Sequence, residues 1–350
     1  MMTGVKALAA AASVAGGLGV LADAAAADPI ADFYRGKTYN IYTGTGENST
    51  GAVVQYTRAV SQFIGRHIPG NPTVVQRSMP GAGGIKAANF IYGIAPQDGT
   101  VHGFISRGFI IQPLMGTQQA QFDPTKFQWI GSTSSEVSVG AVWSAGTDAK
   151  TIQDAMQKEI VVGGTAPGQD TGLYPLVLNK LIGTKFKVVT GYASSSEVDL
   201  AMQRGEAQGK IGWTWGNLNA GNTADWVKTG KVRVIIQMGL EKSPRIPADV
   251  PLLLDFARNA EDRQLMEVVF GPAATGYPSF MGPNVPKDKV ETIRQAFRDT
   301  MKDPEFRQVL EKQKLELDPI EGEDVAKIVQ RLYSAPPSVV KRARELIPPS

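Results

Sequence analysis

The hydrophobic and polar positions of this chain follow two periods in turn, first that of a strand and then that of a helix. Residues 37–43 alternate and are rich in β-forming side chains. After a glycine-rich stretch, apolar side chains recur at helical spacing, at Val53, Tyr56, Val60 and Ile64. This order predicts a strand, a loop and an amphipathic helix whose N-cap is Ser49 or Thr50.

The same order is repeated further along the chain. Residues 73–76 form a short β-type run after the turn at 69–72. A second helical stripe follows, on Ile85, Ala88, Ile91 and Ala95. Residues 100–106 alternate again and predict a third strand. Repeated strand–helix units are typical of a parallel sheet covered by helices, so we expect an α/β fold.

The pattern restarts near Val139 and runs through the middle of the chain. It predicts strands at residues 160–164, 187–190, 210–215 and 231–238. Thr151 with Asp154 predicts the start of one helix, and Ser194 with Glu197 that of another, which Gly205 ends. Glycine- and serine-rich loops thus follow the strands at the edge where open α/β sheets bind ligands.

The C-terminal part is helical. One stripe lies on Val290, Ile293, Phe297 and Met301, and Asp303 followed by Pro304 predicts the next helix start. Residues 315–318 form a candidate late strand. Together with the two strand–helix series, this order predicts two α/β lobes with a cleft between them.

Two glycine-rich loops, residues 44–51 and 79–84, each follow a predicted strand and open a predicted helix. Bare backbone N–H groups at a helix N-terminus bind anions, helped by the helix dipole. The candidate ligand-binding residues in these loops are Thr45, Gly46, Glu47, Asn48, Ser49, Gly81, Ala82 and Gly83.

The first 27 residues carry the marks of an export signal. Lys6 precedes an apolar stretch at 7–21, and residues 21–27 offer several A-x-A cleavage sites. We therefore expect a periplasmic protein, without membrane insertion after cleavage. The chain has no cysteine, only two histidines and a net charge of +3. It therefore has no disulfide, thiolate metal site or cysteine nucleophile, and its charge does not point to nucleic acid.

Enzymatic interpretations find little support. The Gly44-Thr45-Gly46 turn resembles a dinucleotide loop, but its next glycine is Gly51 and the second strand lacks a terminal acid. No Gly-Lys-Ser/Thr follows a glycine loop, which argues against a phosphate loop. Ser338 and Lys341 have S-x-x-K spacing within a charged terminal helix. No catalytic residue, metal site or cofactor is expected.

Several side chains near predicted strand ends are candidates for the cleft, each with a structural alternative. Arg107 suits a carboxylate clamp or an ordinary salt bridge. Trp213 and Trp215 lie on one face of a strand and suit either the core or the cleft wall. Glu47 and Asp170 would face solvent, bind a donor on the ligand or use a helix dipole.

The sequence then shows a family likeness. Residues 74–84, which end in Met79-Pro80-Gly81-Ala82-Gly83-Gly84, and the Pro-x-Asp-Gly stretch at 95–100 resemble the tripartite tricarboxylate transporter receptor family. These are the TctC-like, Bug-type periplasmic solute-binding proteins. Residues 285–287 and 303–305 resemble that family's closing helices. The likeness implies a type II periplasmic-binding fold that closes on a small carboxylate and delivers it to integral-membrane transporter subunits.

The resemblance also implies where the ligand loops lie. The loops at 45–51 and 80–84 belong to the first domain. The second domain supplies Thr165, Gly168, Asp170, Thr171, Tyr192, Ser194 and Ser195, and Trp215 completes the candidate site. Domain 1 would comprise residues 28–138 and 271–350, and domain 2 the insertion at 139–270. The two crossovers would act as the hinge.

Three features depart from the family pattern. The acid that the family offers to an ammonium group falls on Val54, and the common asparagine before the second loop is Ser78. An amino-acid ligand paired in the usual way is thus disfavoured unless Glu47 substitutes. The first loop itself, at residues 47–50, is also atypical, which points to a ligand outside the family's usual set. The alternatives to a transport receptor are a sensor that binds a carboxylate and partners a membrane kinase, or a periplasmic enzyme on the same scaffold.

Overall fold

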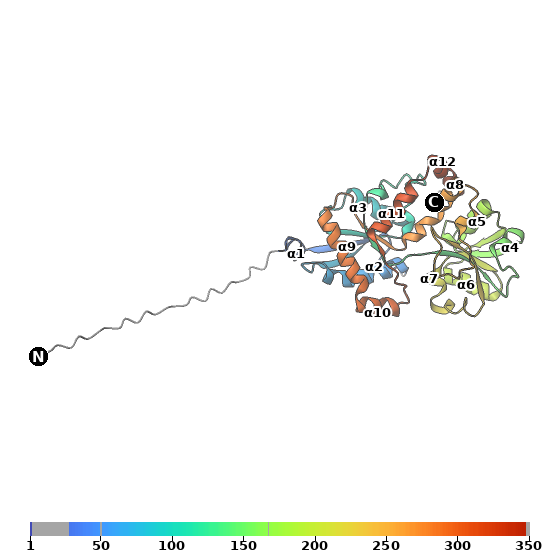
Figure 1. Ribbon diagram of the computed structural model, residues 1–350, viewed down its shortest axis with the longest axis horizontal. Coiled ribbons are helices and arrows are strands. Elements are labelled where there is room, and N and C mark those ends of the chain that lie inside the picture. Colours follow the sequence, from blue (N-terminus) through green and yellow to red (C-terminus); the bar gives the residue numbers. More distant parts are fainter. Residues whose placement is uncertain (2–27, 50, 167, 348–350) are drawn as a thin grey trace.

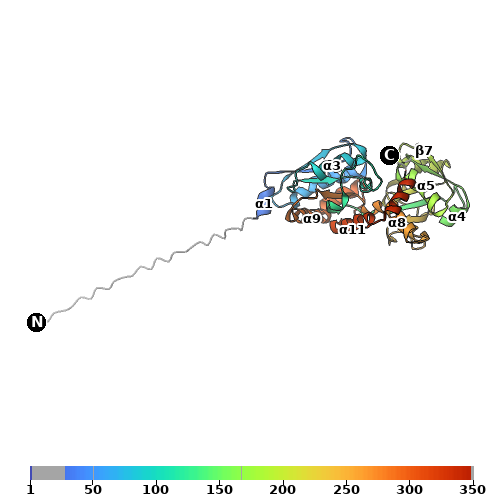
Figure 2. The ribbon, with the colours of Figure 1, turned by 90° about the horizontal axis from the view of Figure 1, so that it is seen from above.

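The computed structural model describes residue 1 and residues 28–347 apart from 50 and 167. The predicted signal peptide therefore lies outside the described residues. The described part of the chain forms two separate α/β lobes, each built on its own sheet (Figures 1 and 2). No helix in this part is long and apolar enough to cross a membrane.

The sheet of the first lobe has six strands in the order β11-β4-β10-β3-β1-β2. β1 pairs in parallel with β2 and β3, whereas β10 pairs antiparallel with β3 and β4, and β11 antiparallel with β4. The strands are β1 (Thr38–Thr43), β2 (Thr73–Ser78), β3 (Val101–Phe104), β4 (Gln128–Ser132), β10 (Pro278–Met281) and β11 (Ile320–Glu321).

The sheet of the second lobe has five strands in the order β7-β6-β8-β5-β9. β6 is parallel to β7 and β8, and β5 is antiparallel to β8 and β9. The strands are β5 (Ser138–Trp143), β6 (Ile160–Gly164), β7 (Phe186–Thr190), β8 (Gly209–Thr214) and β9 (Val232–Met238).

Helices cover both sheets, and their apolar faces form the cores. The first lobe carries α1 (Pro29–Tyr34), α2 (Ala52–Phe63), α3 (Ile85–Gly93), α9 (Lys287–Lys302), α10 (Pro304–Lys312) and α11 (Gly322–Tyr333). The second carries α4 (Ile152–Gln157), α5 (Asp170–Ile182), α6 (Ser195–Arg204), α7 (Trp215–Leu218) and α8 (Ala260–Phe270). The helix α12 (Pro337–Leu346) lies beside α8 and places Val339 and Ala343 in the core of the second lobe (Figure 1).

The chain passes between the lobes through residues 133–137, from β4 to β5, through residues 271–277, from α8 to β10, and again through residues 334–336, from α11 to α12. The first two crossovers touch at Gly276, which has a φ of +57°. A Cβ there would lie 1.7 Å from the carbonyl oxygen of Ser134. Only glycine fits this approach. The division into domains at residues 138 and 270 itself stays a prediction.

The α/β class is confirmed, and the predicted strands, apart from the candidate at 315–318, are found within two residues of their expected bounds. Local helix signals are confirmed as well: Thr151 and Asp154 form a capping box, and Ser194 and Asp303 accept N-cap hydrogen bonds. These motifs lie within one helical turn, so tertiary structure does not disturb them.

Three expectations are wrong. The sheets are mixed rather than parallel, because strands that flank the crossovers enter antiparallel to their neighbours. Residues 315–318 are not a strand, and the pairing starts at Ile320 instead. The N-cap of α2 is Gly51, without a side-chain cap, rather than Ser49; Thr50 lies outside the described residues.

Candidate functional site

The two glycine-rich loops of the first lobe contact each other where β1 and β2 end. A Cβ on Gly44 would lie 2.5 Å from the Cα of Gly84, so the two backbones pass in direct contact. The Ser78 hydroxyl donates to the carbonyl of Thr45, and the Met79 N–H donates to the carbonyl of Thr43 over 2.9 Å. The two loops therefore form one unit at the edge of the first sheet.

The loops of the second lobe are joined in a similar way. The Thr165 N–H donates to the Thr171 hydroxyl over 3.1 Å, and the Gly191 N–H donates to the Thr165 carbonyl over 2.9 Å. The loop that follows β7 leads into α6, whose N-cap Ser194 accepts a hydrogen bond from the Glu197 N–H over 3.3 Å. Both loops thus have defined positions at the end of the second sheet.

A buried lysine, Lys210, forms hydrogen bonds with the first turn of α6. The Lys210 ammonium donates to the Ser195 carbonyl over 3.0 Å and to Asp199 over 2.7 Å, and it lies 4.0 Å from the centre of the Trp213 ring. Burial lowers the pKa of Lys210, which Asp199 opposes. The lysine ties the loop before α6 to β8.

Arg107 joins the two lobes. It begins a short 3₁₀ turn after β3, and its guanidinium donates to the carboxylate of Asp170, the first residue of α5, over 3.2 Å. Burial alone would lower the pKa of Arg107, but Asp170 and Glu136 raise it above its usual range. The helix dipole of α5 adds to the stabilisation of the Asp170 carboxylate.

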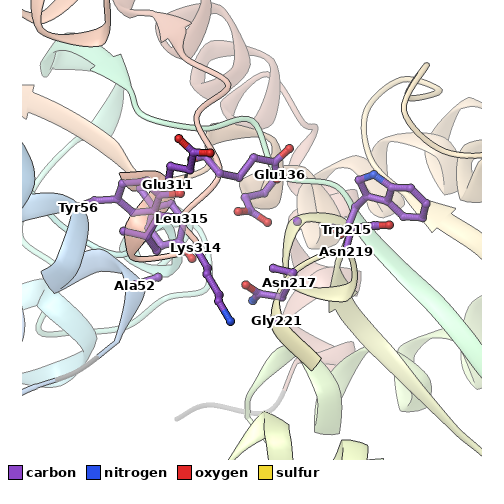
Figure 3. A pocket seen from close by; sticks show the side chains of 14 residues that line it. Ala52, Tyr56, Glu136, Trp215, Asn217, Asn219, Gly221, Glu311, Lys314 and Leu315 are labelled. Carbon is purple, nitrogen blue, oxygen red and sulfur yellow. Dashed lines mark hydrogen bonds between the residues drawn. The ribbon is translucent and has the colours of Figure 1, made fainter. Parts of the chain in front are cut away.

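A cavity of about 450 Å³ opens between the lobes. Its walls come from α2, from the crossover at 133–137, from the segment after β8 and from the end of α10. Figure 3 shows Tyr56 and Lys314 on one side and Trp215 and Asn217 on the other. The lining residues are Ala52, Tyr56, Glu136, Trp215, Gly216, Asn217, Asn219, Ala220, Gly221, Tyr277, Glu311, Lys314, Leu315 and Glu316.

The cavity is acidic and aromatic. Glu136, on the crossover, is 6% exposed, and burial raises the pKa of its carboxyl, while Arg107 lowers it. Burial also raises the pKa of Glu316, which forms an ion pair with Arg245. The Tyr56 and Tyr277 rings lie 4.7 Å apart, and burial together with Glu136 raises the pKa of Tyr277 to about 12.

A second cavity, of about 760 Å³, shares Glu136 with the first and is lined by both charged and apolar side chains. Its three guanidinium and ammonium groups nearest to acids are already in ion pairs: Arg331 with Glu267, Lys327 with Asp324, and Arg245 with Glu316 and Asp318. The first cavity is therefore the better candidate for a ligand site.

No family model matches this sequence, and no curated protein matches it. Several solved structures, however, are similar to this chain. A TctC solute-binding protein from Polaromonas, without ligand, is similar with a TM-score of 0.66 and 17% identity, covering 90% of this chain and 99% of that one. The periplasmic binding protein BugD is similar with a TM-score of 0.55 and 16% identity, covering 89% and 98%. MatC from Rhodopseudomonas palustris with bound malate has a TM-score of 0.54 and 15% identity, covering 89% and 99%.

The chain has the fold of these periplasmic binding proteins. At such identities the likeness concerns the fold, and it confirms the two-lobed architecture that the sequence predicts. The cavity described above lies between the two lobes of this fold, next to the crossovers at 133–137 and 271–277.

Of the ligand-binding residues predicted from the sequence, Trp215 lines this cavity. Arg107 and Asp170 are brought together by the ion pair, and Arg107 is an electrostatic neighbour of Tyr277 and Glu136, which do line it. The remaining predicted residues lie in the loops described above or in the first turns that follow them, and they do not line the cavity: Thr45, Gly46, Glu47, Asn48, Ser49, Gly81, Ala82, Gly83, Thr165, Gly168, Thr171, Tyr192, Ser194 and Ser195. Their role as ligand residues stays a prediction.

Val54, the position of the family's acid, is fully buried in a core cluster of the first lobe, whereas Ala52 and Tyr56 on the same helix line the cavity. What the lack of an acid at position 54 implies for the ligand stays a prediction. The two tryptophans lie in different environments: Trp213 is in the core and Trp215 is in the cavity wall. They do not share one strand face because β8 ends at Thr214.

The two histidines lie away from the cavity. His102 is fully buried in β3, 3.1 Å from the Tyr39 hydroxyl, and burial lowers its pKa to about 3. His67 lies 2.9 Å from the carboxylate of Asp303. Among the described residues, no group of three histidines, cysteines or acids is placed to hold a metal ion.

Sequence reasoning missed Glu136, Tyr56, Tyr277 and the segment from Lys314 to Glu316. Tyr56 was assigned only to the apolar stripe of its helix, where it is indeed buried. Glu136 follows the polar run Thr133-Ser134-Ser135, which local patterns cannot distinguish from an ordinary loop. The signal available in the sequence was the position of this acid between two predominantly buried strands, β4 and β5.

Proposed function

We propose that this chain is an exported solute-binding receptor that captures a small organic carboxylate between its two lobes. The observation that carries the proposal is the cavity between the lobes, with Arg107 held beside it by an ion pair that spans the cleft. A volume of about 450 Å³ suits a small metabolite. The structural similarity to MatC with bound malate supports a carboxylate as ligand.

In this proposal, closure of the lobes brings the glycine loops of the first lobe towards the loops before α5 and α6. Backbone N–H donors and one guanidinium on a carboxylate in a dry cleft support micromolar affinity, about −8 kcal/mol. The protein would be exported by residues 1–27 and deliver its ligand to integral-membrane transporter subunits of the tripartite tricarboxylate type. A sensor that partners a membrane kinase would use the same binding step.

A thermal-shift screen tests the proposal. The purified protein is heated with mono-, di- and tricarboxylates, amino acids and aromatic acids, and with sugars and divalent metals as the contrasting classes. A carboxylate at about 100 times its Kd should stabilise the protein by roughly 2.7 kcal/mol and raise its melting temperature. Stabilisation by a sugar or a metal, with no response to any compound that bears a carboxylate, would overturn the proposal.

A further inference from the structure

The charge of the cavity does not suit a ligand that is only an anion. Three acids line it, Glu136, Glu311 and Glu316, against one cation, Lys314, and Arg245 from outside the cavity pairs with Glu316. The nearby guanidinium of Arg107 is engaged by Asp170. A dicarboxylate or tricarboxylate placed in this cavity would therefore meet more negative than positive charge.

Glu136 has an unused acceptor in the cavity. Its side chain is more than nine-tenths buried and has the Thr214 hydroxyl as a neighbour, but its Oε2 atom makes no hydrogen bond of normal geometry with the residues that the structure describes. A buried carboxylate oxygen without a donor costs free energy that a ligand donor would recover. Figure 3 shows Glu136 between the side chains of the two lobes.

The surroundings of Glu136 favour a cation over a neutral donor. Tyr56, Tyr277 and Trp215 line the same cavity, and aromatic faces attract ammonium groups. The Glu316 Oε2 atom is also buried and lacks a hydrogen-bond partner within the described chain, which adds a second acceptor to the cavity wall. Acceptors and aromatic rings together form a typical site for a charged amine.

We infer that the solute carries an ammonium group in addition to its carboxylate, and that Glu136 accepts the hydrogen bonds of that ammonium group. The inference rests on the proposed solute-binding function and narrows its substrate class to zwitterions. Glu136 lies on the crossover between the lobes, so a cation bound there contacts the segment about which the lobes move.

Matched ligand pairs test this inference without any mutation. L-Aspartate is compared with succinate, and L-glutamate with glutarate, by isothermal titration calorimetry; 1,4-diaminobutane serves as an amine without a carboxylate. Since a hydrogen bond to a charged group contributes about 1.5–3 kcal/mol, each amino acid should bind at least tenfold more tightly than its partner without the amino group.

The variant Glu136→Gln identifies the acceptor. It should weaken the binding of the amino acid by about tenfold or more and leave that of the dicarboxylate within about threefold. Glu206→Gln, the same change at an exposed acid outside both cavities, should leave all affinities unaltered. Circular dichroism and the melting temperature verify that each variant folds. If Glu136→Gln does not fold, the comparison of ligand pairs on the wild-type protein still tests the inference.

The outcomes separate this inference from the proposed function. If the dicarboxylates bind as tightly as the amino acids, or more tightly, the inference is wrong and the proposed function stands. If the diamine binds and no carboxylate or amino acid does, the proposed function and the zwitterionic solute are both wrong. If no compound of these classes binds, both are wrong.

Discussion

Asp303 shows how one side chain can stabilise two elements at once. It caps α10 by accepting from the backbone N–H of Glu305 over 2.9 Å, and it accepts from Arg66 Nε and lies against His67 Nε2 at the same distance. Burial alone would raise the pKa of Asp303, but these hydrogen bonds lower it to about 2.

A carboxyl whose pKa is lowered by folding stabilises the protein above its unfolded pKa, and this contribution is lost as the pH falls towards 2. The variant Asp303→Asn keeps an N-cap acceptor but loses the charge. We expect it to lower the free energy of unfolding by about 2 kcal/mol at pH 7 and by progressively less between pH 4 and pH 2. Urea unfolding at several pH values measures this difference.

Asp225→Asn provides the control for this experiment, since Asp225 is exposed. Its effect should stay within about 0.5 kcal/mol at every pH. A difference between Asp303→Asn and the wild type that does not depend on pH would show that packing, rather than the charge of Asp303, accounts for the loss.

At the scale of elements, close packing of the second glycine-rich loop fixes its position at the edge of the first sheet. Gly84 has a φ of +98°, and a Cβ there would lie 2.3 Å from Ile105 Cγ2. Gly83 also has a positive φ, of +61°, but a Cβ there would meet nothing within 4 Å. Substitution of Gly83 therefore tests backbone strain alone, whereas substitution of Gly84 tests backbone strain together with close packing.

Gly83→Ala should cost about 1–2 kcal/mol of stability, the penalty for a left-handed residue with a side chain. Gly84→Ala adds the collision with Ile105 and should cost about 1–3 kcal/mol more. Guanidinium unfolding of both variants gives the comparison. Equal losses would contradict the close packing of Gly84 against Ile105.

At the scale of the whole molecule, the Arg107–Asp170 pair spans the cleft. The Arg107 side chain is 15% exposed and that of Asp170 is 41% exposed, so solvent screens the pair in part. A pair of this kind contributes about 1 kcal/mol, which is a factor of about five in an equilibrium between open and closed lobes.

Asp170→Asn should therefore shift the ligand-free protein towards open lobes, seen as a larger radius of gyration in small-angle X-ray scattering. Asp148→Asn is the matched control, because Asp148 pairs with Lys158 inside the second lobe. An Asp170→Asn protein that scatters like the control would show that the pair does not hold the lobes together.

The strands and helix caps were predictable from sequence because each depends on residues a few positions apart. The period-two run before Gly44, the capping box of Thr151 and the Asp303-Pro304 start are local patterns. The direction of β4, β5 and β10 was not predictable, since it depends on where the chain crosses from one sheet to the other.

The sequence by itself determined that the chain is α/β, where most strands lie, and that glycine loops follow them. Only the tertiary structure decided that Val54 lies in the core, and that Trp213 packs in the core while Trp215 lines the cavity. It also decided that Glu136 is buried in a cavity between the lobes. The physical reason is distance along the chain. The walls of that cavity come from residues 52, 56, 136, 215–217, 219–221, 277, 311 and 314–316, and no local pattern relates segments that meet only when two lobes form.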